Sequence, residues 1–194
     1  MKTKNKLGLI AAVAAALLGT LGVTDSPAPM EMFLKIDTID GEATDSKHQD
    51  WIIIESMSHG VLRPTTNVVA GGGSGRTTGP CVLQDIVVTK EVDKSTPKLN
   101  LALCDGTSFQ DVEIELVRSV AGTNQTYYKI EFHDVLVSSV QPSGSADSSG
   151  DKPTEEVSFN FTKIVWTYTE FDDTKGTSKG QTTATWDLTA PGPT

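Results

Sequence analysis

The sequence predicts an all-β protein: a two-sheet β-barrel or sandwich with one short α-helix packed at the side. Two observations favour this class. After residue 30, Thr, Ser, Val and Gly are plentiful, whereas long windows of Ala, Leu, Glu and Lys are missing. About seven or eight segments are rich in β-branched and aromatic residues and are separated by polar turns. The 194 residues are enough for one domain with a sizeable core.

The N-terminal segment differs from the rest of the chain. Lys2, Lys4 and Lys6 precede an uncharged stretch, residues 7–24, that is rich in Ala, Leu and Gly. This pattern predicts a secretory signal over residues 1–25, with a membrane anchor as the alternative. Without the three lysines the chain has 13 basic and 25 acidic residues, a net charge of −12. We therefore expect no nucleic-acid partner and, after signal removal, no membrane contact.

The first half of the domain is predicted to contain three strands and one long loop. Residues 32–39 alternate between apolar and polar side chains, and residues 51–57 (WIIIESM) are too short and too β-branched for a helix. Residues 81–91 form the third strand. Residues 58–79 hold Pro64 and several glycines, and we expect a flexible loop there. Phosphate binding by this loop is not expected, because no helix follows it.

One short helix is predicted at residues 96–104. Ser95 or Thr96 can cap its first turn, Pro97 suits the first helical position, and Gly106 stands where a C-cap glycine is common. A helix of about two turns with one apolar side should lie against a sheet.

The second half is predicted to be entirely β. Residues 109–120 and 126–141 alternate in polarity, and residues 181–188 close the fold. Residues 155–171 exceed the usual strand length, so we expect a bend or bulge within them. Both faces become apolar at residues 164–168, which predicts burial on two sides. Together the strands should form a closed or nearly closed barrel or sandwich.

Little in the sequence indicates catalysis. The three histidines, His48, His59 and His133, are not spaced as metal ligands, and no Gly-x-Ser-x-Gly motif is present. Glu113 and Glu115 are most simply solvent-facing residues of one strand. We therefore predict a protein that is not an enzyme and has no cofactor or metal.

The two cysteines, Cys81 and Cys104, are a candidate disulfide. Pairing is favoured if the chain reaches an oxidising compartment, and two separate buried thiols are the alternative.

Four segments follow one another through residues 30–189: MFLKIDTIDGEA, VTKEVDKSTPKLNLALCDG, FHDVLVSSVQPSG followed by PTEEVSFNFTKIVWTYTE, and GQTTATWDLT. In this order they resemble the haemolysin-coregulated protein (Hcp) family, which forms the inner tube of bacterial type VI secretion systems. Residues 190–194 are left as a short tail.

The resemblance implies a compact β-barrel that closes into hexameric rings, and rings that stack into a hollow tube without an active site. Residues 96–104 would be the short helix of the family, and residues 58–79 the extended loop that reaches a neighbouring ring. The candidate stacking residues are Val69, Ala70, Gly71, Gly72, Gly73, Ser74, Gly75 and Arg76. Besides further copies of the chain, small protein effectors in the lumen or a spike protein would be partners.

The secretory signal departs from the family pattern, because such tubes assemble in the cytoplasm. Either the chain starts at Met30 or Met32 and is cytoplasmic before secretion, or it is exported to the periplasm or the cell exterior. An exported chain could instead be a binding module for carbohydrate or a surface partner. Apolar residues on both faces of 51–54 and 164–168 favour self-association.

Overall fold

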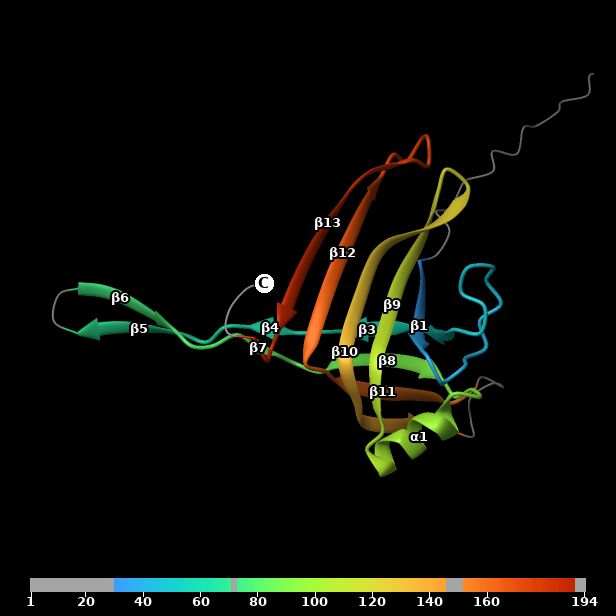
Figure 1. Cartoon of the computed structure of the whole chain (residues 1–194), viewed down its shortest axis with the longest axis horizontal. Helices are drawn as coiled ribbons and strands as arrows, with labels where there is room; N and C mark the ends of the chain where they lie inside the picture. The colour runs from blue at the N-terminus through green and yellow to red at the C-terminus, as the bar shows by residue number, and fades with distance from the viewer. Residues whose placement is uncertain (1–29, 71–72, 146–151, 191–194) are drawn as a thin grey trace, which may run out of the picture.

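The computed structural model describes residues 30–70, 73–145 and 152–190 (Figure 1). The elements in this part of the chain are β1 (Glu31–Ile36), β2 (Ile52–Ile54), β3 (Ser56–Ser58), β4 (Val61–Leu62), β5 (Thr65–Ala70), β6 (Gly73–Thr78), β7 (Val82–Leu83), β8 (Ile86–Glu91), α1 (Thr96–Asp105), β9 (Ser108–Val120), β10 (Thr123–Ser143), β11 (Thr154–Asn160), β12 (Lys163–Phe171) and β13 (Ser178–Asp187). The predicted mainly-β fold with one short helix is therefore confirmed. The predicted signal and residues 191–194 of the tail lie outside the described residues.

Nine strands form one antiparallel sheet in the order β2-β1-β9-β10-β11-β8-β3, with β12 paired to β10 and β13 paired to β12. The two strands at the ends of this order, β2 and β3, are neighbours in the sequence, since Glu55 alone separates them. The strand ladders of the described residues do not close into a barrel, so of the two predicted forms the closed one is wrong and the nearly closed one remains.

Strand β10 joins the two layers of the sheet. Its first half pairs with β12 through residues 128–133, and its second half pairs with β11 through residues 136–143. Between them Asp134 has a φ of 50°, a left-handed conformation that Asp tolerates better than most residues. A bulge follows between Val137 and Ser139. The strand therefore bends at the point where its partner changes, as the curved ribbon shows (Figure 1).

Three predicted strands are each divided into two. Residues 51–57 form β2 and β3, residues 81–91 form β7 and β8, and residues 155–171 form β11 and β12. The last break is a corner rather than a bulge: Phe161 is buried, and the Thr162 N–H donates to the His133 carbonyl at 3.1 Å. Ile164 and Thr167, on opposite faces of β12, are buried, but Val165 and Trp166 are only partly buried and Tyr168 is 48% exposed, so the predicted burial of both faces holds only in part.

The main core is made almost entirely of aliphatic and aromatic side chains between the two layers. Phe132 packs edge-to-face against Phe159 and Phe161, with ring centroids 5.9 Å apart in each pair. Fully burying one such side chain stabilises the fold by about 1.5–3 kcal/mol. This cluster fixes the position of β10 relative to the corner at Phe161.

Helix α1 buries Leu99 and Ala102 and ends at Gly106, whose φ is 71° and whose N–H donates to the Ala102 carbonyl. The predicted C-cap is therefore confirmed. The predicted side-chain N-cap is not formed, because the Ser95 hydroxyl donates to Asp93 instead. Thr96 donates to Glu155 of β11 at 2.8 Å, so the start of the helix is held by the sheet.

Candidate assembly surfaces

The most prominent surface is a projecting ribbon, residues 61–83, which we call the arm (Figure 1). Within it β5 and β6 form a two-stranded sheet with six residue pairs, from Thr65 opposite Thr78 to Ala70 opposite Gly73. The ladders of the described residues pair these strands with each other alone. The prediction of an irregular loop was wrong here, because backbone pairing orders a segment whose glycines suggested flexibility.

The candidate stacking residues lie at the end of the arm. Val69 and Ala70 belong to β5, and residues 73–76 belong to β6. Gly71 and Gly72 lie outside the described residues. The described members of the set therefore lie opposite one another in one hairpin, Val69 facing Ser74 and Ala70 facing Gly73, and their role in stacking stays a prediction.

The part of the arm next to the body carries exposed apolar side chains. β4 pairs with β7, and Val61, Leu62 and Val82 are all exposed, Val61 to 53%. A separate two-stranded ribbon is only marginally stable in water, and neighbouring exposed apolar residues commonly mark an interaction surface. This surface suits contact with another chain.

A second surface is the outer edge of β13. This strand pairs with β12 across residues 178–187, and no strand of the described chain pairs with its other edge. Residues 181–184 are exposed and uncharged. Long edges of this kind readily accept a strand from another chain.

The loop of residues 37–51 covers the outward face of β1 and β9 and forms a small second core. Phe33, Ala43 and Val117 are buried there, and Trp51 packs against them. His48 is buried too, with its ring stacked 4.2 Å from that of Phe33. Sequence reasoning missed the burial of His48, because its partners are distant in the chain.

Two carboxylates hold the His48 ring. Nδ1 lies 2.7 Å from Asp45 Oδ1, and Nε2 lies 2.8 Å from Glu115 Oε2. The hydrogen bond from His48 is the main reason that the pKa of Asp45 lies below its usual value. Burial raises the pKa of Glu115, but hydrogen bonds from Thr126 and His48 outweigh it and hold the pKa below its ordinary value.

Glu113 differs sharply from its neighbour Glu115. Burial, a hydrogen bond with Glu115 and nearby like charges raise the pKa of Glu113 to about 7, although Lys129 opposes the shift. Both glutamates are half-buried, so the prediction that they simply face solvent was wrong. The loop of residues 37–51 shields both glutamate side chains from part of the solvent.

His133 and Asp134 have different partners: His133 Nδ1 contacts Asp111 at 2.5 Å, and Asp134 accepts a hydrogen bond from Thr162. Across residues 30–70, 73–145 and 152–190, no group of three or more His, Cys, Asp or Glu side chains is placed to hold a metal ion. No helix in the same ranges is long and apolar enough to cross a membrane.

Cys81 precedes β7 and is partly buried, whereas Cys104 lies exposed near the end of α1. Both thiols are free in the structure, so a bond between them stays a prediction about the exported, oxidised chain. If it forms, thiol titration of unfolded, unreduced protein should find no free thiol and reduction should release two. Two free thiols before reduction would contradict the pairing.

An antiparallel β fold with a projecting arm and an unpaired strand edge offers surfaces for contact with other chains. Comparison with known proteins identifies the family to which the chain belongs. The model of the family described as "Type VI secretion system effector, Hcp" matches residues 33–168. Protein hcp1 of Pseudomonas aeruginosa is 34% identical over 140 residues, covering 72% of this chain and 83% of that protein. The major exported protein of the same organism is 31% identical over 144 residues, covering 70% and 78%.

Solved structures agree. A type six secretion system protein that is 30% identical superposes with a TM-score of 0.72, covering 82% of this chain and 96% of that one. Hcp1 from Salmonella typhimurium, 26% identical, has a TM-score of 0.64, with 82% and 95% covered. The chain therefore belongs to the Hcp family of type VI secretion proteins, and the resemblance stated from the sequence is confirmed.

Proposed function

We propose that this chain is a self-assembling ring and tube subunit of a type VI secretion system, with a structural role rather than a catalytic one. The observation that carries the proposal is the arm: a six-pair hairpin with exposed apolar residues where it meets the body. A neighbouring copy would cover that surface. Family membership supports a tube role, and the name of the major exported protein supports export.

We assign two contacts to the proposed assembly. The free edge of β13 would pair with a neighbour within a ring, because strand pairing satisfies exposed backbone groups. The arm would contact the next ring, as the position of residues 69–76 at its end suggests. Ile53, 51% exposed between the buried Ile52 and Ile54, is a further apolar residue that a neighbour could cover. A hexamer is the ring size that the family likeness favours.

The proposal that the chain has no catalytic role rests on the partners of its polar residues. Two of the three histidines pair with carboxylates, His48 with Asp45 and Glu115 and His133 with Asp111. Trp166 and Trp186 pack against the main core, so they do not offer the exposed aromatic surface that carbohydrate binding needs. Small effector proteins in the lumen and a spike protein at the tube end remain the proposed partners.

Light scattering over a range of concentrations tests the ring. We expect a discrete oligomer near six times the monomer mass, and a persistent monomer at high micromolar concentration would contradict the proposal. Deleting residues 69–75 leaves Thr66 and Thr77 able to close a shorter hairpin. That variant should form rings, but the affinity of one ring for the next should fall at least tenfold, which corresponds to about 1.4 kcal/mol or more of binding free energy.

The matched variant for the ring contact is Thr182→Lys, which puts a charge on an exposed position of the β13 edge. It should weaken rings and leave the fold of the monomer intact. If the arm deletion abolishes rings while Thr182→Lys does not, the two contacts have been assigned the wrong way round.

A further inference from the structure

The ribbon that carries the arm is interrupted where it leaves the body. β3 pairs with β8 at Ser58 opposite Val87, and β4 pairs with β7 at Val61 opposite Leu83. Two residues separate these pairs on one strand and three on the other, the unequal spacing of a β-bulge. We call His59, Gly60, Gln84 and Asp85 the hinge.

One strand of the hinge is fastened by polar contacts. The Gln84 N–H donates to the Gly60 carbonyl at 2.8 Å. The Asp85 carboxylate accepts hydrogen bonds from Ser138 of β10 at 2.6 Å and from Asn160 of β11 at 2.8 Å. These bonds tie the returning strand to the sheet.

The outgoing strand is fastened differently, by the His59 ring. Its centroid lies 5.8 Å from the Phe161 ring and 6.2 Å from the Trp166 ring. Both ring nitrogens are buried without a hydrogen-bond partner. Burial lowers the pKa of His59, because a buried imidazolium loses its hydration, and this effect outweighs the nearby Gln84 backbone, which raises the pKa.

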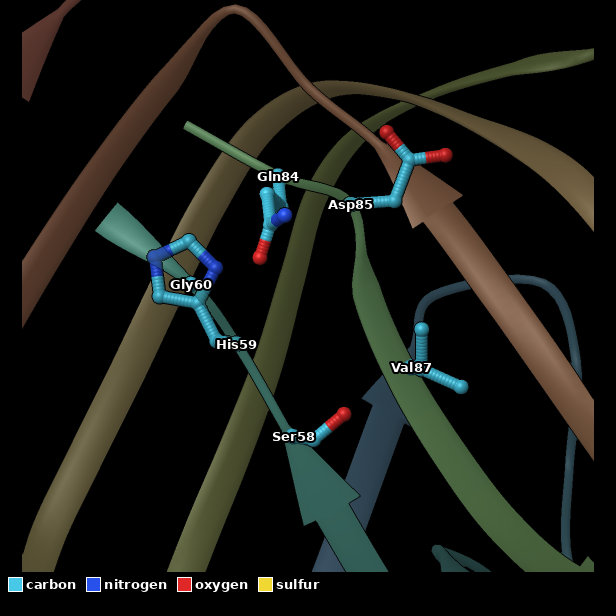
Figure 2. Close-up of a pocket in the computed structure, with 6 residues that line it drawn as sticks. All are labelled: Ser58, His59, Gly60, Gln84, Asp85 and Val87. Carbon is cyan, nitrogen blue, oxygen red and sulfur yellow. The ribbon is translucent and has the colours of Figure 1, made fainter. Parts of the chain in front are cut away.

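A cavity of about 420 Å³ lies beside the ring, lined by Ser58, His59, Gly60, Gln84, Asp85 and Val87 (Figure 2). The Gln84 side chain lies over Gly60, where an added Cβ would come within 1.8 Å of Oε1. The charged residue among the lining side chains is Asp85, and its two oxygens already accept hydrogen bonds. Phe161 and Trp166 bring no charge. The His59 ring in this position has no hydrogen-bonded carboxylate beside it among the described residues, so a proton on the ring would not be neutralised there.

We propose that His59 is a pH-sensitive switch at the arm hinge: the neutral ring docks against Phe161 and Trp166 and fixes the arm, and protonation releases it toward the cavity. An imidazolium beside aromatic rings gains some cation–π attraction, but losing its hydration at both nitrogens outweighs that gain. Released, the ring reaches solvent and Asp85. The arm would then be fixed near neutral pH and more mobile in acid.

The direction follows from proton linkage. The docked ring has a lowered pKa, so the released form binds more protons once the pH falls below the ordinary histidine value of about 6.5. Docking is fully favoured above that value and weakens below it. Between about pH 7.5 and about pH 5.5, release should rise by up to about tenfold, provided that the docked pKa lies below that range.

Amide hydrogen exchange of the whole protein tests the switch, read at peptides containing the Gln84 amide and corrected for the intrinsic pH effect. Protection should fall by up to about tenfold between those two pH values. His59→Phe and His59→Gln, which cannot be protonated, should show no such change. His133→Gln, at an exposed contact with Asp111, should keep the response of the unaltered protein.

Equal protection at both pH values in the unaltered protein would overturn the proposal, as would an unchanged response in both His59 variants. Because exchange at the hinge is measured whatever the size of the assembly, a failure of ring formation would be recognised separately by light scattering.

Discussion

Replacing Lys90 with Met is expected to lower the free energy of unfolding by about 3–5 kcal/mol, because it leaves buried carboxylates without their cation. Lys90 and Glu155 are both 0% exposed, and Nζ lies 2.8 Å from Glu155 Oε1. The same ammonium donates to Asp93 at 2.8 Å and to the Glu91 carbonyl at 2.7 Å. One lysine thus joins β8, β11 and the turn before α1.

Urea denaturation measures the loss. The matched control is Lys94→Met, since Lys94 pairs with Asp50 at 3.3 Å but both side chains are about half exposed, 48% and 53%. That change should cost less than about 1 kcal/mol. Adding Glu155→Met to Lys90→Met should recover part of the loss, because the unpaired carboxylate is removed as well. Equal losses for Lys90→Met and Lys94→Met would contradict the role assigned to this cluster.

Local sequence patterns predicted those strands and helices whose formation depends on alternation or on backbone preference. β9 and β10 were found from alternation, since each has one face on the core. α1 was found from Pro97 and Gly106, because proline and glycine have backbone preferences that act without tertiary contacts. The length of the run at residues 155–171 predicted a bend or bulge, but it did not place the corner at Phe161, since no glycine or proline marks it.

The polar contacts between distant segments could not be predicted from the sequence. His48 meets Glu115, and Lys90 meets Glu155, only because the fold brings distant segments together. The arm was missed for another reason: its glycines permit many conformations, and cross-strand pairing selects one. Periodicity reports which face is buried, and it carries no information about which polar groups meet there.

Glu113→Gln should stabilise the protein above about pH 7 and have little effect near pH 4. The Glu113 side chain is 25% exposed, and its carboxylate lies 3.8 Å from Lys129. Burial, a hydrogen bond with Glu115 and neighbouring carboxylates raise its pKa from 4.5 to about 7. The folded protein therefore holds a proton that the unfolded chain has lost, and stability falls as the pH rises from about 4.5 to about 7.

The neutral amide in the Glu113→Gln variant would avoid this loss. Each pKa unit corresponds to about 1.4 kcal/mol, so the rise from 4.5 to about 7 sets an upper limit of about 3.5 kcal/mol, and solvent screening of the partly exposed carboxylate lowers the expected gain near pH 8 to about 2–3 kcal/mol. Denaturation near pH 4 and near pH 8 measures it. Glu115→Gln is the matched comparison, because the Glu115 carboxylate accepts hydrogen bonds from His48 and Thr126 and its pKa is lowered. That variant should lose stability near pH 8, so a gain in both variants, or in neither, would show that the two carboxylates are not held in opposite charge states by the fold.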